Sequence, residues 1–393
     1  MDTIKRVQLS DIADLITKGT TPTTLGYDFQ DEGVNFLKVE CFAENGDFIK
    51  EKSAHISEEC HEKLKRSQLK AGDVLFSIAG AIGRVAVVTE EMLPANTNQA
   101  LAIIRIDRDD IYLPYFKLIL TSPIVKAQFE RKKQGVAQLN ISLKDISELE
   151  IPLPEMDKQI EYATLFEKVS RVIAARQQEL QKLDELVKAR FVEMFGNSEY
   201  PSEPLDNNVI EMFIGPFGSS LKNECFVDEE DGFCMVYEQK HAIQKTMNVP
   251  TRYVPKSKYE ELKRFAVVGG DIIVSCRGTI GEIFIVPEDA PMGIMHPSIM
   301  KIRLDTTKYN QKFFVFALER YMDEHTAEAK GSGVKMAVSA TVLGQSDFVL
   351  PPIEIQNQFA AFVEQTDKSK VVVQQALLKA QLLFDSLMQE YFG

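Results

Sequence analysis

The chain consists of two copies of one unit, offset from each other by about 198 residues. Gly72-Asp73 recurs as Gly270-Asp271, and Leu64-Lys65-Arg66 recurs as Leu262-Lys263-Arg264. The same offset relates Ser77 to Ser275, Gly80 to Gly278, Gly135-Val136 to Gly333-Val334, and Glu40 to Glu238. Matches spread over a whole half of the chain indicate an internal duplication. Residues 1–196 and 197–393 are therefore predicted to fold into two similar structures.

Each copy begins with a mixed region in which short strands precede a helix. Runs rich in β-branched residues predict the strands, and longer apolar patterns predict the helices. The predicted strands are Asp73–Ile78, Arg84–Thr89 and Leu101–Ile106 in the first copy and Asp271–Cys276, Glu282–Val286 and Ile299–Leu304 in the second. The predicted helices are Tyr115–Lys132, interrupted by Pro123, and Lys312–Glu328. This part of each copy is predicted to be an α+β domain.

A long helix is predicted to complete each copy. Ile151-Pro152-Leu153-Pro154 and Leu350-Pro351-Pro352 end the mixed regions, because proline removes a backbone donor and restricts the residue before it. The segments 155–195 and 354–392 contain no Gly or Pro, and their apolar residues recur three and four apart, as in a coiled coil. These apolar positions are Phe166, Val169, Ile173, Leu180, Leu183, Val187 and Met194, and then Val363, Thr366, Val373, Leu377, Ala380, Phe384, Leu387 and Tyr391; Arg176, Arg190 and Lys370 interrupt the pattern.

The two helices are predicted to pack against each other, each forming a rod of roughly 60 Å. The predicted organisation is a domain at 1–154, a helix at 155–196, a second domain at 197–352 and a second helix at 353–393. If the helices run antiparallel, an approximate two-fold axis relates the domains. Such a molecule suits a DNA target with two separated half-sites, although other elongated partners would also fit.

Composition limits the class of protein. The formal charge is −13, which argues weakly against non-specific coating of nucleic acid but allows a DNA-binding protein with local basic loops. Apolar runs are shorter than a membrane span needs, and the polar start at 1–10 does not resemble a secretory signal. The five cysteines lack the spacing of a zinc site and are expected to be reduced thiols. We expect a cytoplasmic protein.

The duplication, the Gly-Asp runs at 71–75 and 269–273, and the two proline junctions resemble the specificity subunits of type I restriction-modification systems. In the first junction Gln159 follows Ile151-Pro152-Leu153-Pro154, and in the second we take Gln358, after Leu350-Pro351-Pro352, as its counterpart. The resemblance covers the whole chain. It implies that each domain is a target-recognition domain for one half of a bipartite double-stranded DNA site, and that the helices set the spacer.

The resemblance also implies partners. Two adenine methyltransferase subunits would dock on the helices and methylate DNA with S-adenosylmethionine, and restriction-translocase subunits would use ATP with Mg. This chain is then expected to be non-catalytic and to carry no cofactor or metal. In agreement, the sequence contains no Asn-Pro-Pro-Tyr-like motif and no Gly-x-x-x-x-Gly-Lys-Ser/Thr phosphate loop.

Base recognition needs Arg, Lys, amide or hydroxyl side chains on loops. The first domain offers Thr20, Thr21, Thr23, Asn96, Asn98, Gln99, Lys132, Lys133 and Gln134. The second offers Ser219, Ser220, Lys222, Gln239, Lys240, Arg277, His296, Lys330, Ser332 and Lys335. Because Asn98-Gln99 becomes His296-Pro297 and Ala79 becomes Arg277, we expect the two domains to recognise different sequences.

Two other classes of function stay open. A coiled-coil scaffold with two protein-binding domains would have the same architecture. A stand-alone nuclease is disfavoured, because Asp73 and Asp271 lack acidic companions at the spacing of a metal site and are better explained as turn residues. Ser77 and Ser275 are matched, but no matched histidine accompanies them as a base.

Overall fold

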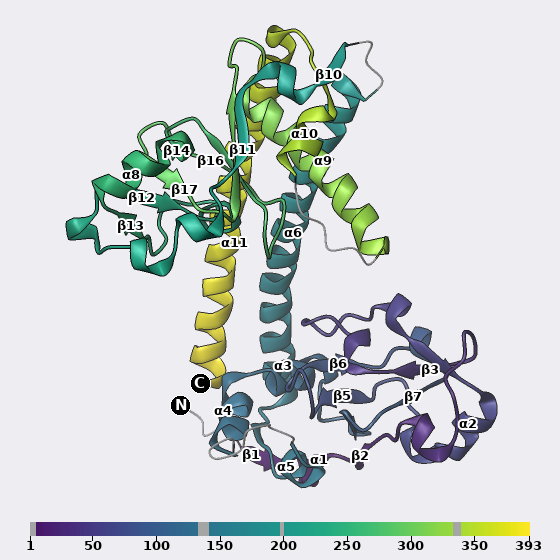
Figure 1. Ribbon diagram of the computed structural model, residues 1–393. Coiled ribbons are helices and arrows are strands. Elements are labelled where there is room, and N and C mark those ends of the chain that lie inside the picture. Colours follow the sequence, from purple (N-terminus) through teal and green to yellow (C-terminus); the bar gives the residue numbers. More distant parts are fainter. Residues whose placement is uncertain (1–4, 133–140, 197–199, 333–338) are drawn as a thin grey trace. The chain divides into compact units, whose positions relative to one another are not determined.

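The computed structural model describes residues 5–132, 141–196, 200–332 and 339–393 (Figure 1). The chain divides into two compact units: unit 1 comprises residues 1–178 and 374–393, and unit 2 comprises residues 179–373. Each unit therefore contains one α+β domain and one segment of each long helix. The predicted domain limits, which place whole helices between the domains, stay a prediction.

Unit 1 contains a four-stranded antiparallel sheet, in the order β2-β8-β5-β6, and a three-stranded sheet, β4-β3-β7, in which β3 and β7 are parallel. A short pair, β1-β9, joins the two ends of the domain. The strands are β1 (Arg6–Gln8), β2 (Leu15–Lys18), β3 (Val34–Leu37), β4 (Ala54–Ile56), β5 (Val74–Ser77), β6 (Val85–Val87), β7 (Ala95–Thr97), β8 (Leu101–Arg105) and β9 (Glu150–Pro152). The helices are α1 (Leu9–Ile12), α2 (Glu58–Lys63), α3 (Leu113–Leu120), α4 (Pro123–Lys132) and α5 (Leu143–Ser147).

Unit 2 repeats this topology with one additional strand, β14, at the edge of its second sheet. Its sheets follow the orders β11-β18-β15-β16 and β13-β12-β17-β14, with β12 and β17 parallel, and β10 pairs with β19. The strands are β10 (Ser202–Pro204), β11 (Val209–Ile214), β12 (Cys234–Tyr237), β13 (Tyr253–Val254), β14 (Ala266–Val267), β15 (Ile272–Ser275), β16 (Ile283–Ile285), β17 (Gly293–Met295), β18 (Ile299–Leu304) and β19 (Asp347–Val349). The helices are α7 (Gln239–Gln244), α8 (Lys256–Leu262), α9 (Gln311–Ser332) and α10 (Ala340–Gln345). The predicted duplication and α+β class are confirmed.

The sheet register corrects one predicted correspondence. Leu37 of β3 pairs with Thr97 of β7, and Tyr237 of β12 pairs with Met295 of β17. Positions in β12 therefore lie 200 residues after their equivalents in β3, whereas positions in β17 lie 198 residues after their equivalents in β7. Glu238 therefore corresponds to Lys38, not to Glu40. The local turn agrees, because Lys38 N donates to Cys41 Sγ and Glu238 N donates to His241 Nδ1.

The repeated Gly-Asp pair has a structural role. Asp73 accepts two hydrogen bonds from Arg105, at 2.6 and 2.7 Å, and one from Lys70 N. Asp271 accepts the equivalent bonds from Arg303, at 2.7 and 2.8 Å, and from Val268 N. Both carboxylates are 1% exposed. These bonds close the turn and tie it to the neighbouring strand, which confirms the turn role predicted for both residues.

The long helices α6 (Met156–Phe195) and α11 (Ile353–Phe392) pack in opposite directions. In unit 1 the start of α6 meets the end of α11, where the Phe166 ring lies 5.3 Å from the Phe384 ring. In unit 2 the end of α6 meets the start of α11, where the Phe191 ring lies 5.4 Å from the Phe359 ring. Every predicted coiled-coil position is buried or half-buried, and the interrupting Lys370 forms an ion pair with Asp184 of the facing helix at 2.6 Å.

A buried glutamine fixes each helix to its domain. Gln159 Oε1 accepts from Tyr112 N, and Gln159 Nε2 donates to the carbonyl oxygens of Asp110 and Pro154. In unit 2 the same three bonds are made by Gln356, to Asn310 N and to the carbonyl oxygens of Lys308 and Pro351. The predicted counterpart, Gln358, is exposed, so that prediction is wrong. The position five residues after the matched proline is the one that reaches the domain.

Candidate nucleic-acid interface

In each unit the loops that hold most of the candidate residues meet at one edge of the parallel strand pair. In unit 1 the loop after β2 lies against the turn between β7 and β8, because Gly19 N donates to Asn98 O at 3.2 Å. A Cβ on Gly19 would lie 1.6 Å from Thr97 O, so only glycine allows this approach. In unit 2 Gly215 takes the same place, where a Cβ would lie 2.3 Å from His296 O.

Hydroxyl and amide groups make up the unit 1 surface. Thr21 Oγ1 lies 2.6 Å from Gln99 Oε1 across the two loops. Thr20, Thr23 and Gln99 are exposed, and Thr21 and Asn98 are half-buried. The structure thus brings together five residues that are separated by up to 79 positions in the chain. Side chains of this kind can donate to and accept from base edges and phosphates.

Asn96 is part of the interior of unit 1. Its side chain is fully buried and donates to Leu64 O and Ser67 Oγ, both at 3.0 Å, while its oxygen lies against His61 Nδ1. These partners occupy the amide completely. We therefore leave Asn96 out of the proposed DNA contacts and assign it to the packing of β7 on the 3₁₀ turn at Lys65–Ser67.

In unit 2 the corresponding surface carries more charge. Glu238 forms ion pairs with Lys240, at 2.7 Å, and with Arg252, and it lies close enough to His296 to influence its pKa. Burial lowers the pKa of His296, and the nearby Arg252, Arg277 and Lys240 lower it further against the opposing effect of Glu238. His296 is therefore neutral at pH 7, and its Nδ1 lies 2.7 Å from Ser298 Oγ.

The remaining unit 2 candidates flank this charged group. Arg277, Ser219 and Lys222 are exposed, while Ser220 and Gln239 are half-buried. Within the described ranges, no carboxylate lies within salt-bridge distance of Arg277 or Lys222. A Cβ on Gly278 would lie 3.8 Å from Gln239 Nε2, so the turn between β15 and β16 adjoins the start of α7. Two cations thus remain available for an anionic ligand.

The predicted basic loops fall largely outside the described residues. Lys133, Gln134 and Lys335 lie there entirely. Lys132 is the last residue of α4, and Lys330 and Ser332 lie in the last turn of α9, so the two loops begin at matching places in the fold.

Two residues that the sequence reasoning missed stand out at these surfaces. Arg252 pairs with Glu238 and lies over the Phe226 ring at 3.9 Å, so it ties β13 to the charged group. Phe217, which occupies the place of Thr21, is 87% exposed. The mismatch of threonine and phenylalanine at one repeat position could have indicated Phe217, but only with the register that Gly19 and Gly215 establish.

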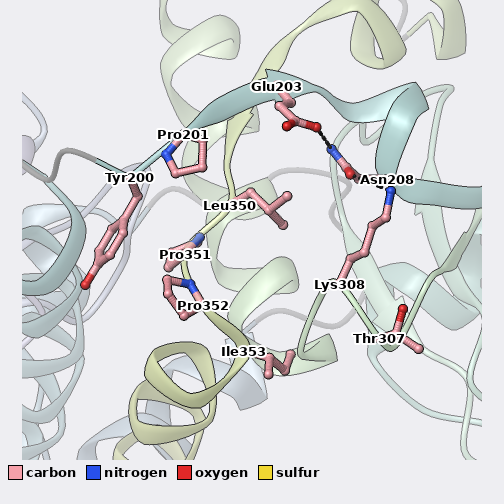
Figure 2. Close-up of a pocket in the computed structure, with 10 residues that line it drawn as sticks. All are labelled: Tyr200, Pro201, Glu203, Asn208, Thr307, Lys308, Leu350, Pro351, Pro352 and Ile353. Carbon is pink, nitrogen blue, oxygen red and sulfur yellow. Dashed lines mark hydrogen bonds between the residues drawn. The ribbon is translucent and has the colours of Figure 1, made fainter.

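A pocket of about 520 Å³ lies beside the second domain–helix junction in unit 2. Figure 2 shows Tyr200 and Pro201 facing Leu350–Ile353, with Lys308 and Asn208 on the other side. Lys308 Nζ donates to Asn207 O and Asn208 Oδ1, and Asn208 Nδ2 donates to Glu203. Because these polar groups already satisfy one another, we assign the pocket to the junction and not to a ligand. Among the residues that can be described, no three His, Cys, Asp or Glu side chains are grouped as metal ligands.

Comparisons with known proteins agree with the division of the chain into two similar units. A family model described as the type I restriction modification DNA specificity domain matches residues 1–185 and 232–381. The specificity subunit of the type I restriction enzyme EcoBI from Escherichia coli is 33% identical over 138 residues, which covers 35% of this chain and 28% of that protein. The putative specificity subunit of the type I restriction enzyme MjaX from Methanocaldococcus jannaschii is 24% identical over 382 residues, which covers 92% of this chain and 86% of that protein.

A chain in one of the solved structures shares this fold. It comes from the structure described as the basis of complex assembly and conformational transition of the type I R-M system, and it aligns with a TM-score of 0.64 and 16% identity. The alignment covers 98% of this chain and 95% of that chain. In the part of the chain that the structure describes, no helix has both the length and the apolar character to cross a membrane.

Proposed function

This chain belongs to the family of type I restriction-modification DNA specificity subunits, and from that premise we propose that it recognises a bipartite double-stranded DNA site, one half per domain. One observation carries the proposal. The two units share a scaffold down to individual hydrogen bonds, yet they differ at the matched surface positions. Asn98 is replaced by His296 and Ala79 by Arg277. Two similar supports with different polar groups are what recognition of two different half-sites requires.

The proposed contacts are the surface residues that the loops bring together. In unit 1 they are Thr20, Thr21, Thr23, Asn98 and Gln99, and in unit 2 they are Ser219, Ser220, Lys222, Gln239, Lys240, Arg277 and His296. Lys132, Lys133, Gln134, Lys330, Ser332 and Lys335 are proposed on their sequence alone. Charge removal at Lys132 and Lys133 should weaken binding to all sequences and lower its salt dependence. An unchanged salt slope would remove that loop from the interface.

The helices are proposed to set the spacer and to dock two adenine methyltransferase subunits. Both helices expose large apolar side chains, and exposed apolar patches of this kind mark sites of interaction with other proteins. In unit 1 these are Ile160, Val172, Leu378, Leu382 and Leu383, and in unit 2 they are Leu186, Val192, Val371 and Val372. A protein partner in each unit would cover them. Restriction-translocase subunits complete the proposed complex.

Catalysis is assigned to the partners. The methyltransferase subunits would bind S-adenosylmethionine, and the translocase subunits would bind ATP with Mg, so this chain needs no cofactor. The net charge of −13 also favours DNA binding in which the methyltransferases close around the duplex. If the isolated chain bound its site as tightly as the complex in the same salt, this part of the proposal would fail.

The decisive experiment is co-expression with the adenine methyltransferase that the proposal expects in a neighbouring reading frame, followed by mapping of methylated adenines across a genome. We expect a motif of two short blocks separated by a fixed gap. An ungapped motif, or no methylation, would contradict the proposal. The alternative function, a scaffold with two protein-binding domains, predicts no methylation and no neighbouring methyltransferase gene.

The spacer role has its own test. Inserting seven residues into α6 between Gln178 and Glu179, and seven into α11 between Val373 and Gln374, lengthens both helices where the units divide. Seven residues add about 10 Å of helix, which is about three base pairs of DNA. The gap should lengthen by about that number while both blocks keep their sequence. Replacing residues 1–154 by another domain should change one block only; a change in both would refute the assignment of one domain to one half.

A further inference from the structure

Phe217 is the most exposed large apolar side chain in the described part of the chain. Its exposed fraction of 87% means that the domain itself hardly touches the ring. Because the ring is exposed in the folded chain, it contributes little to the stability of unit 2, and its apolar surface is free to contact a ligand.

The loop that carries Phe217 is anchored on both sides. Pro216 and Leu221 are buried, and Ser220 N donates to Phe217 O at 2.8 Å in a short 3₁₀ turn. Lys258 Nζ adds a bond to Ser220 O at 3.3 Å. Before the turn, Gly215 lies directly against His296 O. The ring is therefore projected from a fixed backbone beside the proposed DNA-binding residues.

The matched place in unit 1 has the opposite chemistry. Counting from the equivalent Gly19 and Gly215, Thr21 corresponds to Phe217, and Gln99 corresponds to Pro297. Thr21 and Gln99 are joined by a hydrogen bond across their loops, whereas phenylalanine and proline side chains can form none. Two polar positions in unit 1 thus correspond to two apolar positions in unit 2, of which only Phe217 is exposed.

We propose that Phe217 contacts the C5-methyl group of a thymine in the half-site that unit 2 recognises, and so specifies that base. The methyl group is the apolar feature that base pairs display in the major groove, and phenylalanine is one of the side chains that can contact it. The other contacts proposed for this unit include Arg277, Gln239 and Lys240, which are of the types that hydrogen-bond to base edges in the same groove. This inference rests on the proposed function, because it presumes that unit 2 binds one half of a DNA site.

The test uses the complex of the full chain with its methyltransferase and the motif that genome mapping gives. Each thymine of the unit 2 block is replaced in turn by uracil, which lacks only the methyl group. One replacement should weaken binding of the unmodified complex about four-fold, the effect of one buried methyl group. The same replacement should not change DNA binding by the complex that carries Phe217→Ala. The motif methylated by this variant should accept other bases at that position, while its unit 1 block should keep the same sequence.

Phe233→Ala is the matched control, because Phe233 is a partly exposed phenylalanine of the same unit that packs on Tyr259. It should leave the response to uracil intact. Equal responses to uracil in Phe217→Ala and the unmodified complex, or no response at any thymine, would overturn the inference. In either case a gapped motif methylated by the unmodified complex would leave the proposed function standing, whereas its absence would count against that function instead.

Discussion

Replacing the junction glutamine of unit 2 should destabilise that unit specifically. Gln356 is fully buried, and its amide holds Asn310 N, Lys308 O and Pro351 O at 2.8 to 2.9 Å. Gln356→Met keeps the length of the side chain but leaves three backbone groups without their partner. A buried group that loses its partner costs about 1–3 kcal/mol. Three groups lose their partner, so their costs add. Because Lys308 is exposed and water can reach part of the site, we expect the free energy of unfolding to fall by about 3–4 kcal/mol, near the lower end of that sum.

Urea unfolding followed by far-UV circular dichroism measures this loss, since the chain has no tryptophan to report by fluorescence. Hydrogen exchange with mass spectrometry then locates it: protection should fall in residues 179–373, and Gln159→Met should produce the same fall in the other unit. Gln358→Met is the matched control, because Gln358 is exposed two positions away. A loss below about 1 kcal/mol for Gln356→Met, or an equal loss for the control, would refute the reasoning.

Three further outcomes follow from the units' internal contacts. Asp271→Asn removes the buried charge that Arg303 contacts twice, and since Arg303 is partly exposed we expect a loss of about 2–3 kcal/mol in the same urea titration. Lys301 is buried on Glu211 at 2.7 Å; Lys301→Ile alone should destabilise unit 2. Glu211→Leu with Lys301→Ile, which copies Leu15 and Ile103 of unit 1, should be at least as stable as the unmodified chain. Burial lowers the pKa of His241 and His296, so the unfolded chain binds more protons below pH ~6.5, and stability should fall as the pH drops through that value. His296→Asn, the residue of unit 1, should reduce this fall, and a stability that is flat down to pH ~5.5 would contradict it.

The fold could be predicted from the sequence where a pattern is long or repeated. Proline-free apolar periodicity predicted both 40-residue helices, and the repeated strands β5, β6 and β8 lie within a few residues of their predicted ranges. The first strands of each domain were missed. β2 and β11 have different sequences, so comparing the two copies gave no signal there.

The glutamine at the second junction shows why spacing alone misleads. The first junction has Gln159 five residues after Pro154, and the second offers both Gln356 and Gln358 near the start of a helix. On a helix two positions turn the side chain to nearly the opposite face, so only one of them can reach the domain. Gln356 satisfies the same backbone groups as Gln159, and that shared bonding pattern, which the sequence does not display, decides the correspondence.

The candidate interface was predictable in kind but not residue by residue. The sequence placed amides and hydroxyls near turns, and the structure brings two of these loops together at Thr21 and Gln99. Asn96 had the same chemistry and nearly the same position, but all three residues of β7 are buried, and the Asn96 amide is bonded inside the domain. Phe217 begins the loop that carries Ser219 and Ser220, but base contacts were sought among polar side chains, so it was not proposed. Its exposure depends on the anchoring of the neighbouring Pro216 and Leu221, which is a tertiary effect.

The duplication itself separates the residues that maintain the fold from those that differ in chemistry. Asp73 with Arg105 and Asp271 with Arg303 keep identical bonds in the two units, and so do the junction glutamines. Changing any of these groups leaves buried partners unsatisfied, a cost that is the same in both units. No such buried network involves the half-buried Thr21 or the exposed Phe217, so the two copies are free to differ there. The positions at which two equivalent loops diverge without cost to stability are therefore the ones at which the units can acquire different specificities.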